Sequence, residues 1–476
     1  MFRSRSFSQT GAKVAFSKAC AIPAIIFFGM VGACTTVATP AQIPKAVSIE
    51  PESLEIKRVL KIEELVKQAV DGEFAPGVLV YIDQKGSEPY SFRYGWRDKD
   101  AEAPLSKKDL FRVYSMTKPV TVAAAMVLVD DGVIVLDDPV SKFIPAFSNT
   151  VAYASGESLE DLQTEALDRP VTIRDLMRHT SGMIYKTRAQ DPVTQFYVLK
   201  GIDTGSGVDI PPRDGSAPVE SARELADRIA TIPLVAQPGE KYTYGNAIDV
   251  LGAVVEEASG LTLGAFMSER LFEPLQMHDT FFEVPPDRAS RMTAAYTSRS
   301  VEPRTESVLD VVDISELSVG SLRNFDPSEG GIFTSERAMH YGGAGLVSTA
   351  SDYARFAEML LNKGELNGVR VLNAERVEEM MSNQLSDAAL NASPRLSKDG
   401  VTFGLGGAII RDPNLAPVSV PEGMYFWSGA ASTFFWVDPE NETIGLIMTQ
   451  VIGGDFKSYR LEIIDAWYGD AQERGS

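Results

Sequence analysis

Hydrophobic residues near both ends of the chain follow the spacing of regular secondary structure. Apolar positions recur at helical intervals over residues 56–70, and the segment 76–98 has the pattern of two strands joined by a tight turn. Residues 432–451 predict another strand pair, and a final helix is expected near 459–466. Strand-forming sequence therefore lies at both ends of the chain.

The middle of the chain has a different pattern. Helical stretches alternate there with long polar loops at 186–218 and 283–335, and loops of this length in a compact domain are usually functional. We therefore expect an α/β (α+β) fold in which residues 56–145 and 345–476 form one sheet domain. Residues 146–344 are expected to form a mainly helical inserted domain.

The segment 111–131 contains the most informative helix. The apolar run VTVAAAMVLV follows Pro119, and proline is tolerated only in the first turn of a helix. The helix is therefore expected to begin at about Ser115, with Lys118 one turn later on the same face. The next apolar run, residues 133–147, is predicted to continue as a strand and a turn.

A serine at a helix N-terminus beside a lysine is suited to nucleophilic catalysis. The positive end of the helix dipole stabilises a serine alkoxide, and a neutral lysine can take the hydroxyl proton. A single S-x-x-K match is nevertheless expected by chance in a chain of 476 residues. Ser115 and Lys118 alone therefore leave a purely structural reading open.

Charge and composition exclude several classes of function. The formal charge of −20, from 45 basic and 65 acidic residues, argues against a nucleic-acid partner. The three histidines, His179, His278 and His340, show no metal-binding spacing, so no metal or other cofactor is expected. No G-x-S-x-G motif is present, which argues against a Ser-His-Asp hydrolase.

The N-terminus is predicted to direct export. Four basic residues precede an apolar run at 21–31 that is too short to span a bilayer comfortably. The run ends in Val31-Gly32-Ala33-Cys34, which resembles a bacterial lipobox. Residues 1–33 are therefore expected to be a signal peptide, 34–55 a linker and Cys34 a lipidation site that anchors a periplasmic protein to the membrane. Ordinary cleavage near Ala33 or Ala38 is the alternative.

Two further motifs carry groups with possible chemical roles. Tyr244 and Asn246 form a Y-x-N motif, and a tyrosine hydroxyl can relay a proton to a leaving group. The motif at 427–430, Trp-Ser-Gly-Ala, is predicted to open a strand, where Gly429 would let a backbone N–H approach a substrate. Taken singly, these residues could equally be core aromatics and a strand start.

The order and spacing of the three motifs resemble those of the serine β-lactamase and penicillin-recognising superfamily. The chain is most similar to its class C-related members, the family VIII carboxylesterases. The resemblance covers roughly residues 57–468 and includes the segments LFRVYSMTKPVT, VTIRDLMRHTSG, QPGEKYTYGN, GGAGLVSTASDYARFAEML and WSGAASTFFWVDP. It implies a β-lactamase-like fold, with an antiparallel sheet formed from both chain ends and flanked by helices. His179 would then be a scaffold residue.

The resemblance also implies a role for each motif residue. Ser115 would form the acyl-enzyme with Lys118 as its base, and Tyr244 would carry the proton to and from the leaving alkoxide. Asn246 would orient Lys118 and the acyl group. The backbone N–H groups of Ser115 and Ala430 would form the oxyanion hole, a large electrostatic contribution to catalysis of this kind.

The third motif departs from the family pattern in a way that bears on the substrate. Trp427, followed by Ser428 and Gly429, stands where β-lactamases and DD-peptidases usually have a lysine that helps to bind a substrate carboxylate. Tryptophan offers an apolar wall instead. The expected function is therefore hydrolysis of small carboxylic esters. The alternatives are a β-lactamase or D-alanyl-D-alanine carboxypeptidase, and an inactive cell-wall-binding relative.

Overall fold

The computed structural model describes residues 56–185, 192–202, 214–297, 322–335, 338–453 and 456–472. All of them belong to one unit of the chain, residues 43–476. The predicted signal peptide, Cys34 and the linker lie outside the described residues, and so do parts of both long loops. Export and lipidation therefore stay predictions.

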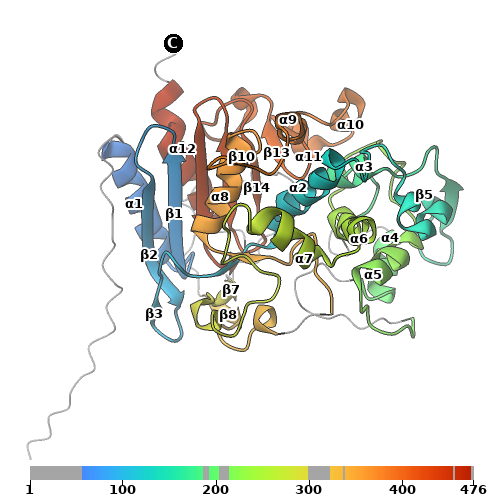
Figure 1. Ribbon diagram of the computed structural model, residues 1–476, viewed down its shortest axis with the longest axis horizontal. Helices are drawn as coiled ribbons and strands as arrows, with labels where there is room; N and C mark the ends of the chain where they lie inside the picture. Colours follow the sequence, from blue (N-terminus) through green and yellow to red (C-terminus); the bar gives the residue numbers. More distant parts are fainter. Residues whose placement is uncertain are drawn as a thin grey trace, which may run out of the picture. The chain divides into compact units, whose positions relative to one another are not determined.

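An eight-stranded antiparallel sheet forms the centre of the molecule (Figure 1). Its strand order is β12-β13-β14-β15-β16-β1-β2-β3, so N-terminal and C-terminal strands meet where β1 pairs with β16 and Leu79 lies opposite Met448. The expected sheet built from both chain ends is confirmed. The strands are β1 (Gly77–Gln84), β2 (Tyr90–Asp98), β3 (Ala103–Pro104), β12 (Val401–Phe403), β13 (Ala408–Ile410), β14 (Tyr425–Ser428), β15 (Phe434–Asp438) and β16 (Thr443–Met448).

Helices cover both faces of this sheet, and β15, which is buried along its whole length, shows the effect on one central strand. Successive residues on a strand point to opposite faces. Phe435 packs with its ring centroid 5.0 Å from that of Tyr353 in α8 (Ala350–Leu361), whereas the indole of Trp436 donates to Tyr468 of α12 (Phe456–Gln472) at 3.0 Å. Gly445 lies opposite Trp436, where a Cβ atom would come within 2.0 Å of the indole.

The other helices lie at the sheet margins and in the inserted segment. None of the helices in the described ranges is long and apolar enough to cross a membrane alone; α6 and the helical stretch after it pass that test only as a pair bent by 77°. These helices are α1 (Ile56–Asp71), α2 (Thr117–Asp130), α3 (Ile173–Met177), α4 (Val193–Leu199), α5 (Ala222–Ala230), α6 (Ala247–Ser259), α7 (Leu263–Met267) with the π-helical turn η4 (Ser268–Phe272), α9 (Ala374–Met380), α10 (Asp387–Asn391) and α11 (Pro394–Ser397).

Short two- and three-stranded ribbons complete the described structure. Two of them pair segments that are far apart in the chain: β4 pairs with β9, and β7 pairs with β17 on one side and with β8 on the other. Their bounds are β4 (Phe111–Arg112), β5 (Val151–Ser155), β6 (Gln163–Ala166), β7 (Ala295–Thr297), β8 (Arg323–Asp326), β9 (Val347–Ser348), β10 (Glu365–Leu366), β11 (Val369–Arg370) and β17 (Val451–Ile452).

Helix α2 is buried on every side. All its residues from Thr117 to Leu128 are buried, as expected for a helix that is apolar around its whole circumference. It lies between the sheet and α6 (Figure 1), so a side chain near its N-terminus is placed deep in the molecule.

The predicted strand over residues 133–147 is wrong. This segment contains the 3₁₀ turns η2 (Val140–Lys142) and η3 (Pro145–Asn149), and Val133 and Val135 are 44% and 58% exposed. The apolar alternation is genuine, because Ile134 and Leu136 are buried. In the described structure, however, no strand pairs with residues 133–137. The segment is therefore a loop whose alternate side chains, Ile134 and Leu136, are buried in the core.

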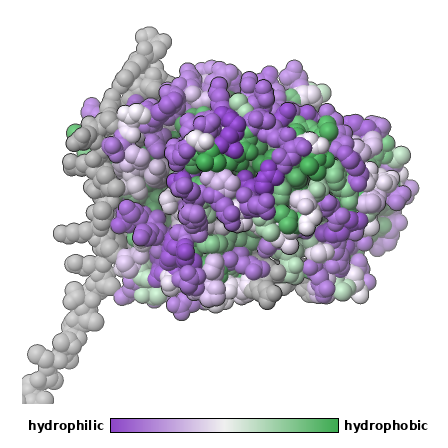
Figure 2. Space-filling model, in the orientation of Figure 1, coloured by the Kyte–Doolittle hydropathy of each residue, from purple (hydrophilic) through white to green (hydrophobic). Residues whose placement is uncertain are grey.

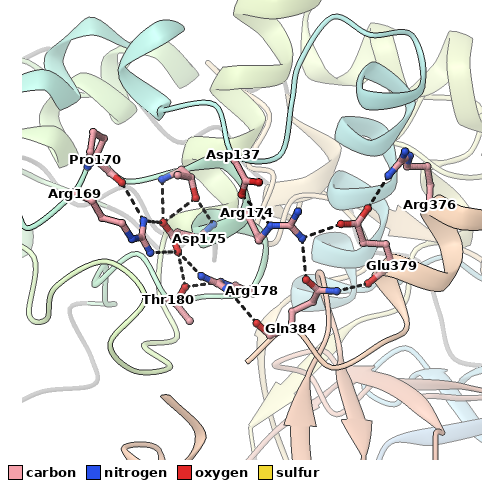
Figure 3. Close-up of polar contacts among 11 residues, drawn as sticks. Asp137, Arg169, Pro170, Arg174, Asp175, Arg178, Thr180, Arg376, Glu379 and Gln384 are labelled. Carbon is pink, nitrogen blue, oxygen red and sulfur yellow. Dashed lines mark hydrogen bonds and ion pairs between the residues drawn. The ribbon is translucent and has the colours of Figure 1, made fainter. Parts of the chain in front are cut away.

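A network of arginines and carboxylates ties α3 to the C-terminal part of the chain (Figure 3). Arg174 donates to Asp137 at 3.1 Å, to Glu379 of α9 at 2.8 Å and to Gln384 at 2.9 Å. The α3 segment also follows the first sheet strands and leads into the site described below. The ion pairs therefore hold α3 against the segment that carries α9 and Gln384.

Asp175 is the buried centre of this network. Its carboxylate is fully buried and accepts hydrogen bonds from Arg169, Arg178 and Thr180 (Figure 3). Burial alone would raise the pKa of this carboxyl, but the hydrogen bonds from Arg169 and Arg178 outweigh burial and lower the pKa to about 2. The ionised carboxylate is thus stabilised by folding.

The visible surface is mainly polar, with hydrophobic residues gathered in patches near the middle of the view (Figure 2). Exposed large apolar side chains in the described ranges include Val133, Val135 and Leu261, the last at 39%. Scattered apolar surface of this kind is ordinary for a folded protein.

We expect Asp175→Asn to lower the free energy of unfolding by about 2 kcal/mol at pH 7, because the mutant loses a carboxylate whose pKa is depressed from 3.8 to about 2 in the folded state. The stabilisation is present above the unfolded-state pKa and is lost as pH falls through the folded-state pKa. Urea unfolding of both proteins should therefore show the difference narrowing by roughly half between pH 7 and pH 3.

Asp137→Asn is the matched control. Asp137 belongs to the same network, but its side chain is 73% exposed. An exposed ion pair contributes roughly 0–1 kcal/mol. An Asp175→Asn effect no larger than that of Asp137→Asn would contradict a stabilising role for the buried carboxylate.

Candidate active site

Ser115 lies in a 3₁₀ turn, η1 (Tyr114–Met116), directly before α2. The helix was expected to begin at about Ser115, and the α-helix itself starts at Thr117. Tyr114 has φ +44°, a left-handed conformation that costs a non-glycine residue roughly 1–2 kcal/mol. This sharp turn follows β4 and leaves Ser115 partly exposed, while Tyr114, Met116 and the residues after them are buried.

Lys118 is fully buried, and its amine contacts three different parts of the chain. Nζ donates to Ser115 Oγ at 3.1 Å, to the Tyr185 hydroxyl at 3.0 Å and to the Gly343 carbonyl oxygen at 2.6 Å. Among the described residues Lys118 makes no ion pair. The predicted nucleophile and base are therefore within hydrogen-bonding distance, as a serine–lysine pair requires.

Two tyrosines flank this amine. Lys118 Nζ lies 4.9 Å from the ring centroid of Tyr244, the tyrosine predicted from the Y-x-N motif. The Tyr185 and Tyr244 rings pack edge to face with centroids 5.5 Å apart. Tyr185 was not predicted; its only sequence signal was its place just after the R-H-T-S-G segment, in which only His179 was assigned a role, that of a scaffold residue.

Asn246 precedes the first residue of α6 and is 1% exposed. Its Nδ2 donates to Asp249 at 2.9 Å, and Asp249 also accepts from the backbone N–H of Gly343 at 2.8 Å. Asp249 was likewise not predicted. Nothing in the sequence distinguished it from an ordinary acidic residue in the first turn of a helix.

Trp427 forms part of an aromatic cluster beside the tyrosines. Its ring centroid is 5.4 Å from that of Tyr244 and 5.2 Å from that of Phe403, and the side chain is 8% exposed. Within the described part of the chain its buried indole Nε1 has no hydrogen-bond partner. Trp427, at the position where related motifs carry a lysine, is thus surrounded by other aromatic side chains.

His179 joins the same cluster as a packing residue. It is fully buried, with φ +56°, and its ring centroid lies 4.7 Å from that of Tyr244. His340 accepts from the backbone N–H of Gly264 at 3.1 Å and stacks on Phe282. No cluster of His, Cys, Asp or Glu side chains in the described ranges could hold a metal ion.

The expectation that Trp427 and Ser428 open a strand is wrong. They are the last two residues of β14, with Ser428 opposite Phe434, and Gly429 begins the turn into β15. Tyr425 and Phe426, before the motif, belong to β14, whereas the aromatic residues after the motif begin a separate strand, β15, at Phe434.

This turn lies tightly against the segment that carries Ser115. A Cβ atom on Gly429 would come within 2.1 Å of Thr433 Oγ1 and 2.4 Å of the Val113 carbonyl oxygen, so only glycine fits. In the described structure, the backbone N–H groups of Ser115 and Ala430 donate no hydrogen bond. Unpaired N–H groups of this kind are what an oxyanion hole needs.

The beta-lactamase family model matches residues 62–465 of the chain. The chain belongs to the beta-lactamase family. The family membership inferred from the three motifs is thereby confirmed, and the eight-stranded antiparallel sheet with its flanking helices is the expected beta-lactamase-like fold.

Several relatives and solved structures align along most of this beta-lactamase family member. Protein Rv1367c of Mycobacterium tuberculosis is 32% identical over 390 residues, covering 81% of this chain and 88% of that protein. Esterase EstB of Burkholderia gladioli is 29% identical over 401 residues, covering 83% and 90%. The structure of EstCE1, described as a hydrolase with promiscuous acyltransferase activity, superposes with a TM-score of 0.68 at 25% identity and covers 87% of this chain and 99% of its own.

We expect Gly429→Ala to abolish most ester hydrolysis, because the added methyl group must displace the turn from the Val113–Ser115 segment. A loss of roughly 10²-fold in kcat is expected, the scale observed when one oxyanion donor is removed or misplaced by about 1 Å. The measurement is steady-state kinetics on a p-nitrophenyl ester.

Gly423→Ala is the control just before the other end of β14. Gly423 has φ +77°, and a Cβ atom added there would have nothing within 4 Å, so its substitution strains the backbone without pushing on the site. It should lower stability by about 1 kcal/mol with little change in kcat. Equal kinetic losses in both variants would mean that the effect is general destabilisation.

Proposed function

We propose that this protein hydrolyses small carboxylic esters through an acyl-enzyme on Ser115. The family and its relatives, among them an esterase and a hydrolase, support an enzyme of the carboxylesterase type. The observation that carries the residue assignment is the hydrogen bond of 3.1 Å between Lys118 Nζ and Ser115 Oγ in a site where the lysine is fully buried.

Acylation follows from this arrangement. Lys118, in its neutral form, takes the proton from Ser115 Oγ as the oxygen forms a bond to the ester carbonyl carbon. The carbonyl oxygen becomes an oxyanion, which the backbone N–H groups of Ser115 and Ala430 stabilise. The tetrahedral intermediate then collapses, the bond to the alcohol oxygen breaks, and the alcohol leaves with a proton. Water then attacks the carbonyl carbon of the acyl-enzyme, the bond to Ser115 Oγ breaks with return of a proton to that oxygen, and the acid is released.

The leaving alcohol needs a proton donor, and a tyrosine hydroxyl beside Lys118 is suited to this step. Tyr244 holds that role in our proposal, as the Y-x-N motif predicts. The Tyr185 hydroxyl, 3.0 Å from Lys118 Nζ, extends the proton path on the other side of the amine. Asn246, buried at the start of α6, supports the acyl group and the Lys118 surroundings.

The aromatic surroundings favour uncharged substrates. Trp427, with Tyr244 and Phe403 next to it, replaces the cation that would attract a substrate carboxylate. Apolar contact with an acyl or alcohol group is then the main source of binding, at roughly 25 cal/mol per Å² buried. Ser428 and Gly429 connect Trp427 to Ala430, so the Ala430 N–H lies next to this aromatic surface in our proposal. β-Lactam or D-alanyl-peptide hydrolysis is the alternative for the same nucleophile.

Ser115→Ala and Lys118→Ala should each lower kcat on a short-chain p-nitrophenyl ester by about 10⁴-fold or more, because each removes one half of the nucleophile pair. Wild type and both variants are assayed in parallel on that ester and on a chromogenic cephalosporin. Circular dichroism verifies that the variants are folded.

The paired assay separates the candidate functions. Preference for the ester supports the proposal, and preference for the cephalosporin identifies a β-lactamase. A folded wild type that turns over neither substrate indicates the inactive relative. Full activity in folded Ser115→Ala would disprove the assigned nucleophile.

Trp427→Ala should reduce kcat/KM for a hydrophobic acyl ester by about 10-fold or more while changing an acetyl ester less, because only the larger group loses apolar contact. Trp427→Lys should raise kcat/KM for the cephalosporin relative to both esters, because it introduces a cation for the carboxylate. Equal losses on every substrate in Trp427→Ala would show that the ring is scaffold and would leave the nucleophile assignment intact.

A further inference from the structure

The turn at Gly342 and Gly343 is held between α2 and α6 by hydrogen bonds from both helices. From α2, Thr121 Oγ1 donates to the Gly342 carbonyl oxygen at 2.7 Å, and Lys118 Nζ donates to the Gly343 carbonyl oxygen at 2.6 Å. From α6, Asp249 Oδ1 accepts from the Gly343 backbone N–H at 2.8 Å. Thr121 and Asp249 thus hold the Gly342–Gly343 peptide from both sides, and the next peptide, which carries the Gly343 carbonyl, is held by the Ala344 N–H, which donates to the Tyr341 carbonyl oxygen at 3.3 Å.

The close packing of this turn requires both glycines. A Cβ atom on Gly342 would lie 2.6 Å from the Ile248 carbonyl oxygen, and one on Gly343 would lie 2.8 Å from Asp249 Oδ1. The backbone of the turn can therefore approach α6 closely enough for the Asp249 hydrogen bond. Asp249 is 2% exposed, and its second oxygen accepts from Asn246 Nδ2 at 2.9 Å.

The Gly343 carbonyl has a consequence for how Lys118 can act as a base. A carbonyl oxygen only accepts hydrogen bonds, so it occupies one N–H of the lysine whether the amine is charged or neutral. A neutral amine has two N–H groups and one lone pair. With one N–H on Gly343 and the other on the Tyr185 hydroxyl, the lone pair is directed at Ser115 Oγ.

We propose that Asp249 is the positioning residue for this base: through the Gly343 N–H it holds the carbonyl that aims the Lys118 lone pair at Ser115. The inference rests on the proposed function, since it assigns a role relative to Ser115 and Lys118. The hydrogen bonds of Asp249 used here go to Asn246 and to the Gly343 backbone. Its effect reaches the nucleophile through one backbone residue, and the same carboxylate also fixes Asn246.

The proposal predicts a loss of turnover without a loss of binding. Asp249→Ala should lower kcat on a p-nitrophenyl ester by about 10²-fold and change KM by less than about 3-fold, the pattern of a misplaced catalytic group. Asp249→Asn should keep more activity than Asp249→Ala, because an amide oxygen can still accept from the Gly343 N–H. Thermal unfolding is measured on every variant.

A double-mutant cycle with Gly343→Ala tests the connection itself. With Asp249 in place, the added methyl group collides with the carboxylate and should lower kcat. In the Asp249→Ala background that carboxylate is absent, so adding Gly343→Ala should cost little further. The two changes should therefore be strongly non-additive. Additive losses, or an Asp249→Ala enzyme with kcat within about 3-fold of wild type, would overturn the proposal.

Asp352→Asn provides the control for a purely structural role. Asp352 of α8 is a buried carboxylate, 7% exposed, that accepts from the Asp279 backbone N–H at 2.7 Å and from Thr280 Oγ1 at 3.1 Å, and these partners are neither Ser115, Lys118 nor the Gly342–Gly343 turn. The substitution Asp352→Asn should lower the unfolding temperature and leave kcat unchanged. Equal kcat losses in Asp352→Asn and Asp249→Asn at equal loss of stability would also overturn the proposal.

Ser115→Ala belongs in the same series. Activity in folded Ser115→Ala contradicts the proposed function. Inactive Ser115→Ala beside fully active Asp249→Ala contradicts the positioning role alone.

Discussion

Burying a lysine amine completely is the constraint on which the site depends. An amine removed from water must find partners for its N–H groups, because an unpaired buried polar group is costly. Lys118 Nζ lies within hydrogen-bonding distance of three groups, in η1, in the segment after α3 and in the Gly342–Gly343 turn. Each partner lies on a different part of the chain. The amine can therefore keep all three contacts only when these three parts are packed correctly against one another.

The sheet and the ion-pair network bring these elements together from distant parts of the chain. Pairing of β1 with β16 closes the N-terminal and C-terminal strands into one sheet, and α2 packs against it. The Arg174 contacts with Glu379 and Gln384 then hold α3, and with it the segment that leads to Tyr185, against the C-terminal part. The surroundings of Lys118 and Ser115 therefore depend on contacts between distant parts of the described unit.

The sequence predicted the features that depend on local pattern. Short apolar runs on either side of a turn predicted β1, β2, β15 and β16, and the restriction on Pro119 located the start of α2 to within two residues. The family and fold followed from motif order. Two predictions failed because a local pattern does not show its strand partners. Among the described residues, 133–137 alternate but have no neighbouring strand, and Trp427 and Ser428 close β14 because the turn into β15 begins at Gly429. Tyr185 and Asp249 escaped prediction since their roles arise only from contacts across more than sixty residues.

The unpartnered indole of Trp427 bears on how such a site can diversify. Lys118 draws its three acceptors from elements other than β14, and no described side chain depends on the Trp427 N–H for a hydrogen bond. Exchanging this ring therefore orphans no buried donor or acceptor. The hydrogen bonds of Lys118 therefore do not depend on the residue at position 427, whose ring meets the site only by packing against Tyr244.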